Sequence, residues 1–294
     1  MFNISVLQEP ETLDAAVEML QANAGLRVIA GGTDVLIRMQ HGADGWSELL
    51  SLRRVKELER ITLRPDGTFE IGATATFASI FRHPDLRRWM PILTEAAVSM
   101  GGPQVRNVAT IGGNICNGAV SGDSASTLFA LDALLKLASL DGERIIPIRE
   151  FYAGPGKVHL RPGEILSAIL IPRDSYQGAG GHYIKFAMRR AMDIATLGVA
   201  VLCRVQDGCF QDLRIGLGVA APVPIRCADA EAYAQGRPIT RETLREVGRL
   251  AVTASKARTS WRASKDYREH LIEVLTERAA LEAAVRAGGC LADN

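Results

Sequence analysis

Two pairs of adjacent glycines are the residues in this 294-residue chain whose type and spacing best suit ligand chemistry. Gly31-Gly32 follows an apolar stretch within residues 27–34, and Gly112-Gly113 follows another within residues 108–123. Paired glycines allow positive φ angles, and a ligand can approach their backbone because no Cβ intervenes. Outward-facing amides in such a turn bind phosphate without any lysine. The spacing therefore predicts a phosphate-binding turn at each pair, and the hydroxyl of Thr33 can add a donor.

Either pair alone is more typical of ordinary turn chemistry. Together they predict two turns that clamp one pyrophosphate. Asp123 precedes a helical run, where its carboxylate either caps the helix or accepts a hydrogen bond from a ribose or ribityl hydroxyl. The chain has no Rossmann or P-loop signature. The segment GLGVAA weakly resembles the Rossmann signature. Pro222 would stop the helix that this signature requires, so we predict a strand there.

Charge and composition argue against several other functions. The chain has 34 basic and 33 acidic residues, so no overall field recruits nucleic acid or a membrane surface. Its five cysteines form no CxxC pair and its five histidines show no zinc spacing, so we expect reduced thiols and no protein-bound metal. The N-terminal residues lack signal-peptide character, and no apolar run is long enough to span a bilayer. We expect a soluble cytoplasmic protein that binds neither nucleic acid nor membrane.

Local signals place the first glycine pair between regular elements. Apolar periodicity predicts an amphipathic helix starting near Leu13, a strand over residues 27–30, and a helix or extended crossover over residues 35–40. Turn pairs at Asp66-Gly67 and Asp141-Gly142 predict two hairpins.

The sequence pattern changes near Tyr176. Residues 176–181 read YQGAGG, which is typical of a linker, and strand-rich sequence follows. From Cys227 onward, helical periodicity predicts two or three helices packed on those strands. We expect one domain over residues 1–176 and a second over residues 182–290.

The glycine segments and other stretches resemble the FAD-binding subunits of molybdenum hydroxylases, most closely the flavin subunits of bacterial xanthine dehydrogenases. The resemblance covers nearly the whole chain, in VIAGGTDVLI, GPQVRNVATIGGNICNGAVSGDS, FYAGPGKV, YIKFAMRRAMDIATLGVA, GLGVAAPVPIRC and SWRASKDYREHL. It implies an α+β fold with a two-part FAD-binding domain of the vanillyl-alcohol-oxidase type. A small domain of antiparallel strands and a helical bundle would follow.

The resemblance also implies which residues bind FAD. Two segments would line the pyrophosphate, Asp123 would hold a sugar hydroxyl, and Lys185 would contact the flavin, although a strand lysine usually faces solvent. Asp193, Ile194 and Ala195 resemble the segment near the reactive edge of the flavin, with a buried strand start as the alternative. The expected FAD-binding residues are Arg27, Val28, Ile29, Ala30, Gly31, Gly32, Thr33, Asp34, Ala109, Thr110, Ile111, Gly112, Gly113, Asn114, Asp123, Ile165, Leu166 and Lys185.

Two positions differ from some members of this family. Met100 stands where some relatives have a phenylalanine, so aromatic stacking from this position is not carried over. Some relatives hold a [4Fe-4S] cluster through four cysteines, but only Cys116 lies in a cofactor-like motif here, so we expect no cluster. A Gly112→Val substitution is expected to block the approach of the pyrophosphate.

The implied function is electron transfer within a xanthine dehydrogenase complex. Partner subunits would carry molybdopterin and [2Fe-2S] clusters, and FAD in this chain would pass electrons to NAD as hydride. Such a subunit needs no catalytic acid or base of its own. A subunit acting with an aldehyde, carbon monoxide or an N-heterocycle stays open as an alternative, as does a non-catalytic nucleotide-binding module.

Overall fold

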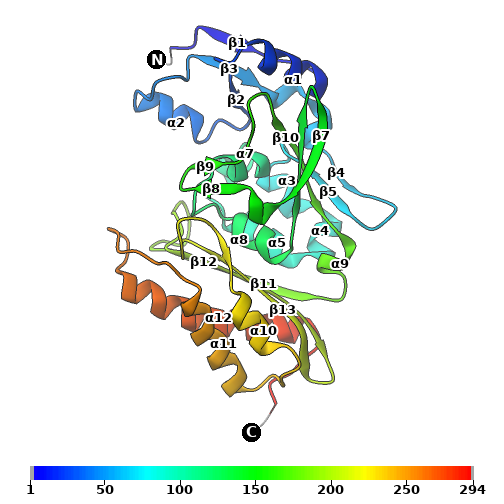
Figure 1. The fold of residues 1–294 in the computed structure, drawn as a ribbon, viewed down its shortest axis with the longest axis vertical. Helices are drawn as coiled ribbons and strands as arrows, with labels where there is room; N and C mark the ends of the chain where they lie inside the picture. Colours follow the sequence, from blue (N-terminus) through cyan, green and yellow to red (C-terminus); the bar gives the residue numbers. More distant parts are fainter. Residues whose placement is uncertain (1–2, 293–294) are drawn as a thin grey trace.

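The computed structural model describes residues 3–292, and its three main sheets follow one another along the long axis of the molecule (Figure 1). The first sheet is parallel, with strand order β1-β3-β2. Thr12 caps the first helix by accepting a hydrogen bond from the amide of Ala15, and Ala16 and Val17 on that helix are buried. The elements are β1 (Val6–Gln8), α1 (Leu13–Ala22), β2 (Arg27–Ile29), α2 (Val35–Gln40) and β3 (Glu48–Ser51).

The second sheet is antiparallel, with order β4-β5-β10-β6-β7. Its central strand β10 is buried along its whole length, as its sequence, apolar except for Ser167, indicates. The predicted hairpins at Asp66-Gly67 and Asp141-Gly142 are confirmed as β4–β5 and β6–β7. The elements are η1 (Leu52–Arg54), η2 (Lys56–Glu59), β4 (Ile61–Leu63), β5 (Phe69–Gly72), β6 (Leu134–Ser139), β7 (Gly142–Pro147), η3 (Ile148–Glu150), β8 (Tyr152–Gly154), β9 (Lys157–Val158) and β10 (Ile165–Ile171).

Short helices lie between the second sheet and the third (Figure 1). They are connected by few residues and mostly begin at proline or a capping threonine, which suits a first helical turn. They are α3 (Phe77–Arg82), α4 (Pro84–Trp89), α5 (Pro91–Ser99), α6 (Pro103–Arg106), α7 (Ile111–Cys116), α8 (Ala125–Ala130) and, later in the chain, α9 (Arg173–Tyr176).

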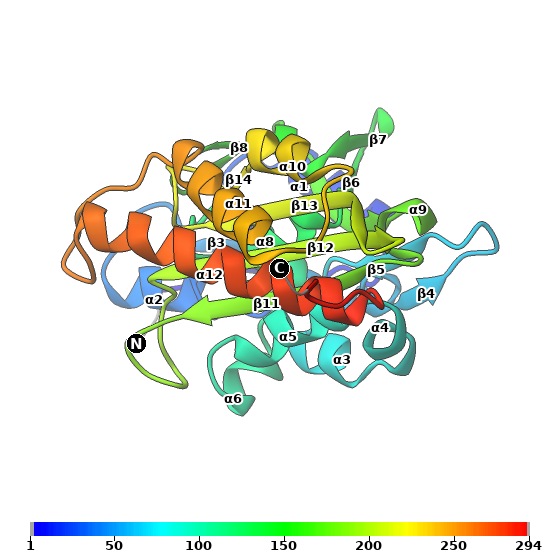
Figure 2. The same cartoon turned by 90° about the horizontal axis from the view of Figure 1, so that it is seen from below.

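The third sheet is antiparallel, with order β11-β12-β13-β14, and is covered on both faces. Helices α10 to α12 pack on one face (Figure 2), while α5 and α8 pack on the other. The predicted helices after Cys227 are confirmed, as is the strand at GLGVAA, where β13 ends. The elements are β11 (Gly180–Phe186), β12 (Leu197–Gln206), β13 (Cys209–Gly218), β14 (Ile225–Arg226), α10 (Ala228–Ala234), α11 (Arg241–Thr253) and α12 (Lys265–Arg286).

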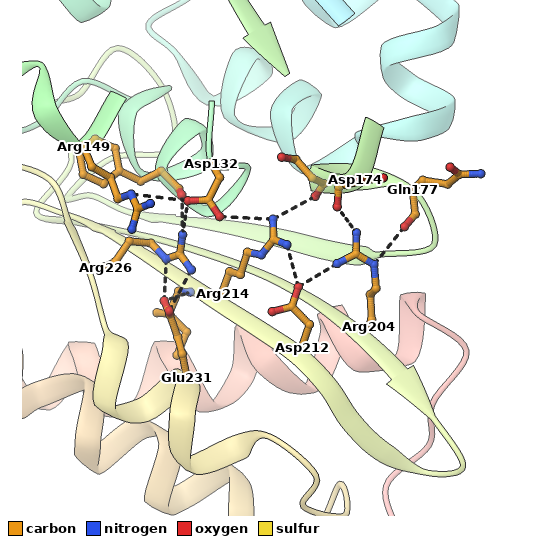
Figure 3. Close-up of polar contacts among 12 residues, drawn as sticks. Asp132, Arg149, Asp174, Gln177, Arg204, Asp212, Arg214, Arg226 and Glu231 are labelled. Carbon is orange, nitrogen blue, oxygen red and sulfur yellow. Dashed lines mark hydrogen bonds and ion pairs between the residues drawn. The ribbon is translucent and has the colours of Figure 1, made fainter. Parts of the chain in front are cut away.

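A network of ion pairs fastens the third sheet to the helices above it (Figure 3). Arg226 on β14 donates to Asp132, just beyond α8, over 2.7 Å and also pairs with Glu231. Arg214 on β13 reaches the same aspartate at 3.5 Å. Most of these side chains are largely buried, where ion pairs are screened less than at the surface. The residues labelled in Figure 3 are Asp132, Arg149, Asp174, Gln177, Arg204, Asp212, Arg214, Arg226 and Glu231.

The arrangement confirms the predicted α+β class with two parts. Strands β11 and β12 contribute side chains to the cores on both sides of the third sheet. A side chain in the covered part of these strands can therefore be buried on either face, which matters for Lys185 below. In the described range, every helix is too short or too polar to traverse a bilayer.

Candidate functional site

The two glycine segments meet in the structure. A Cβ built on Gly31 would lie only 2.0 Å from the carbonyl oxygen of Val108, so only glycine permits this approach. Beside the contact lies an open cleft. Most predicted site residues line it: Val28, Ala30, Gly31, Gly32, Thr33, Asp34, Ala109, Thr110, Gly112, Gly113, Asn114, Ile165 and Leu166.

The first glycine segment has the properties of a phosphate-binding turn. Gly32 has φ +73°, in the left-handed region that favours glycine. Within residues 3–292, the amides of Gly31, Gly32, Thr33 and Asp34 donate no hydrogen bond. Unpaired amides need a partner from outside the chain, either water or a ligand. Four consecutive free donors beside the cleft provide a local anion site in a nearly neutral protein.

The second glycine segment is not a turn, and here the prediction was wrong. Thr110 is the N-cap of α7, and its hydroxyl accepts from the amide of Gly113 at 3.2 Å. The amide of Ile111 donates to Ala75 and that of Gly112 donates to Ala73, over 3.0 and 2.8 Å. These amides already donate hydrogen bonds within the chain. The segment therefore offers the cleft a glycine surface but few free donors.

The structure gives a different reason for expecting Gly112→Val to be harmful, namely a clash inside the protein instead of a blocked pyrophosphate. A Cβ on Gly112 would lie 2.6 Å from the Cβ and carbonyl oxygen of Ala73, inside the core. A Cβ on Gly113 would meet only the hydroxyl of Thr110, at 2.8 Å. The side chain of a substituted Gly112 therefore points into the protein, and that of a substituted Gly113 does not.

We predict different outcomes for the two glycines. Gly112→Val should lower stability by about 1–3 kcal/mol through overpacking, even in cofactor-free protein. Gly113→Val should cost only about 1 kcal/mol, through the disturbed Thr110 cap, and its main effect should be on FAD content. Thermal unfolding of the FAD-free proteins and the ratio of flavin to protein absorbance measure the two effects. Equal stability of both FAD-free variants would contradict this assignment.

Several residues that line the cleft were not predicted. Arg38 is the most informative, because its guanidinium donates to Asn117 at the end of α7 and lies 5.6 Å from the ring of Trp46. It is the only cation among the lining residues of the described chain. Arg38 lies four residues after Asp34, which puts both side chains on one face of a helix. The sequence alone could therefore have indicated Arg38 as a site residue. The other unpredicted lining residues are Val35, Trp46, Leu52, Ala73, Thr74, Met100, Cys116, Asn117, Leu160 and Glu164.

Two of these lining residues carry ionisable groups whose protonation states do not suit catalysis at neutral pH. Burial raises the pKa of the Cys116 thiol to about 12, so this thiol stays protonated at neutral pH. Glu164 pairs with Arg144 at 2.6 Å, which holds the pKa of that carboxyl below its usual value. Neither group is suited to act as a nucleophile or as an acid at neutral pH.

Five predicted residues lie outside the lining of this cleft. Arg27 is exposed, Ile29 is half-buried on β2, and Ile111 is fully buried in the core. Asp123 and Lys185 lie elsewhere, as a buried ion pair.

In this pair, Lys185 Nζ lies 3.0 Å from both carboxylate oxygens of Asp123, and it also donates to the carbonyl of Ser99 at 3.2 Å. The two side chains are 10% and 9% exposed. Burial raises the pKa of Asp123 to about 6, although Lys185 and the nearby Tyr183 lower it. The N-cap residue of α8 is Ser124, so Asp123 does not cap this helix.

A second cleft begins at Lys185 of this pair. It is lined by Ser99, Lys185 and the segment that runs to Asp193. Ser99 lines this cleft and the adjacent Met100 lines the first, so the two clefts flank the end of α5. Of the three residues expected near the reactive edge, Asp193 lines the second cleft, while Ile194 is exposed and Ala195 is buried.

Comparison with known proteins agrees with this architecture. The family model described as the FAD binding domain in molybdopterin dehydrogenase matches residues 2–174, and that of the CO dehydrogenase flavoprotein C-terminal domain matches residues 182–283. The chain is 43% identical to the xanthine dehydrogenase FAD-binding subunit of Escherichia coli O157:H7, over 99% of this chain and all of the relative. It is 33% identical to the nicotinate dehydrogenase FAD-subunit of Eubacterium barkeri, over 80% of this chain and 81% of the relative.

A solved structure supports the same conclusion. Carbon monoxide dehydrogenase from Hydrogenophaga pseudoflava contains a chain that matches with a TM-score of 0.92 and 28% identity, covering 97% of this chain and 99% of that one. Fold and cleft together define a two-domain FAD-binding flavoprotein. The chain belongs to the molybdenum hydroxylase family, as an FAD-binding medium subunit.

Proposed function

We propose that the chain is the FAD-binding electron-transfer subunit of a xanthine dehydrogenase. The observation that carries the proposal is the row of free amides at Gly31 to Asp34, held against the second segment beside an open cleft. The full-length similarity to a xanthine dehydrogenase FAD-binding subunit supports the choice of substrate. The partners would be a molybdopterin-binding subunit and a [2Fe-2S] subunit, and the electron acceptor would be NAD.

The residues of the two clefts suit FAD. The free amides and Arg38 provide donors for a pyrophosphate, and Ile165 and Leu166 provide an apolar wall. Lys185 lines the second cleft and would provide an ammonium group for polar parts of the cofactor, and its buried partner Asp123 would provide a carboxylate. We retain the predicted set of binding residues as part of this proposal, with Arg38 added.

Bound FAD would supply the redox chemistry between the iron–sulfur clusters and NAD. The chain's own residues would bind and orient it and exclude water. We also propose domains over residues 1–176 and 182–290, supported by the ranges of the two family models. A cytoplasmic location fits the five free thiols of the described chain.

The test is to co-express the chain with its partner subunits and to follow NAD reduction with xanthine, together with flavin absorbance. We expect xanthine-dependent NADH formation and a flavin spectrum that bleaches on reduction. Activity with an aldehyde, carbon monoxide or an N-heterocycle but not with xanthine would reassign the substrate. Protein that binds nucleotides without any flavin would contradict the proposal.

Arg38→Met is predicted to weaken FAD binding about tenfold or more, because a charge-assisted hydrogen bond contributes about 1.5–3 kcal/mol. The matched control is Arg82→Met, since Arg82 is exposed outside the cleft and should leave binding unchanged. Titration of FAD-free protein with FAD, followed by flavin fluorescence, measures both. The effect of Arg38→Met should shrink at high salt. The same affinity for both variants would argue against a role for Arg38.

A further inference from the structure

The loop between α11 and α12 carries an unusually exposed tryptophan. Trp261 is 74% exposed, and the guanidinium of Arg262 lies 4.1 Å from the centre of its ring. Tyr267, in the first turn of α12, is also exposed. Tryptophan, tyrosine and arginine are the residues most enriched at the energetic centres of protein interfaces. We call Arg258, Trp261, Arg262 and Tyr267 the arginine–tryptophan surface.

The segment around this surface is strongly basic. Residues 255–268 contain five lysines and arginines and one acidic residue, Asp266, whereas the whole chain has a net charge of only +1. Lys265 pairs with Glu269 at 3.7 Å. Arg258, Arg262 and Arg268 form no ion pair with any residue between 3 and 292. Three neighbouring guanidinium groups therefore lack a carboxylate within the described chain.

The guanidinium group of Arg268 is fixed in position by burial and by two hydrogen bonds. It is 3% exposed, and it donates to the carbonyl of Thr196 and to the hydroxyl of Ser260, the latter at 2.7 Å. Its Nε is buried without a partner. Burial lowers the pKa of Arg268, and the nearby Arg258 and Arg262 lower it further. An uncompensated buried cation is unfavourable, and an external carboxylate nearby would relieve it.

The arginine–tryptophan surface adjoins the second cleft. Thr196 donates through its amide to the carbonyl of Phe186 at 2.8 Å, and the rings of Phe186 and Tyr267 lie 6.2 Å apart. Phe186 follows Lys185 and lines that cleft. The loop projects from the side of the molecule, at the left of Figure 2. A polypeptide bound there would lie beside the cleft.

We propose that the arginine–tryptophan surface docks an acidic segment of a partner subunit. Guanidinium groups pair with carboxylates through two parallel hydrogen bonds, and the indole ring would be buried by the same contact. The inference rests on the proposed function, since it assigns the docking place of a subunit in that complex. Net basic charge without internal partners favours a carboxylate-bearing occupant over an apolar one.

The experiment compares assembly with the co-expressed iron–sulfur and molybdopterin-binding subunits, followed by sedimentation at low and high salt. Trp261→Ala, and Arg258→Glu combined with Arg262→Glu, should each weaken assembly about tenfold or more. The loss from the charge reversal should be greatest at low salt. FAD content and thermal stability of the isolated chain should stay as in wild type. The matched control is Arg88→Glu, an exposed arginine whose guanidinium lies 5.0 Å from the centre of the Trp89 ring.

A photoreactive p-benzoylphenylalanine in place of Trp261 provides a second measurement. Cross-links to an Asp- and Glu-rich peptide of a partner subunit would support the proposal. Wild-type assembly of both variants would overturn it. So would loss of binding to phosphatidylserine vesicles in the charge-reversed variant with assembly intact, because a membrane would then be the occupant. A wild-type chain that keeps FAD but joins neither subunit would instead overturn the proposed function.

Discussion

Replacing Gly31 by alanine is expected to weaken FAD binding strongly. The new Cβ would lie 2.0 Å from the carbonyl oxygen of Val108 and 3.0 Å from the Cα of Ala109, and both are backbone atoms that cannot rotate away. The two segments must therefore separate, which displaces the free amides from the opposite wall of the cleft. Overpacking of this kind costs about 1–3 kcal/mol, so we expect FAD affinity to fall at least about tenfold.

The ratio of flavin to protein absorbance in purified Gly31→Ala measures this effect. Gly25→Ala is the control, because Gly25 lies just before β2, as Gly31 lies just after it, and its Cβ would meet only side-chain atoms of Asn23 and Glu48. Gly25→Ala should keep its FAD. Full FAD occupancy of Gly31→Ala would show that contact between the two segments is not required.

Replacing Lys185 by methionine is expected to destabilise the protein by about 3–5 kcal/mol at neutral pH. The carboxylate of Asp123 would then be buried without its counter-ion, with one oxygen already lacking a hydrogen bond. The double variant Asp123→Asn/Lys185→Met should recover most of this loss, because neither charge remains. Chemical denaturation of the FAD-free proteins measures both. A single variant within about 0.5 kcal/mol of wild type would contradict the buried pair.

The effect of Lys185→Met should depend on pH. In wild type the pKa of Asp123 is raised by burial from 3.8 to about 6, and losing the ammonium group raises it further. Where the folded protein binds more protons than the unfolded chain, stability falls as pH rises. The extra loss in Lys185→Met should therefore begin near pH 6 and grow toward its new folded pKa, by up to about 1.4 kcal/mol per pH unit. The double variant should show no such growth.

Local signals in the sequence were sufficient for much of the fold. The hairpins at Asp66-Gly67 and Asp141-Gly142 and the helices after Cys227 formed as predicted, because turn residues and apolar periodicity act over few residues. The second glycine segment was misread, although Thr110 three residues before Gly113 is a helix N-cap signal.

Lys185 illustrates what such signals miss. Strand alternation normally places a lysine in solvent, but the third sheet is covered on both faces, so Lys185 on β11 is buried against Asp123. Their pairing joins segments 62 residues apart in the chain. No local pattern indicates such a partner.

The sequence by itself determined the local elements, the family and the two glycine segments as candidate walls of one site. The tertiary structure decided which amides are free. The amides of Gly31 to Asp34 donate no hydrogen bond within the described chain, whereas those of Gly112 and Gly113 do. It also decided what each missing Cβ makes room for: Val108 beside Gly31 and Ala73 beside Gly112. The physical reason is that hydrogen-bond partners and close packing depend on distant segments brought together by the cores.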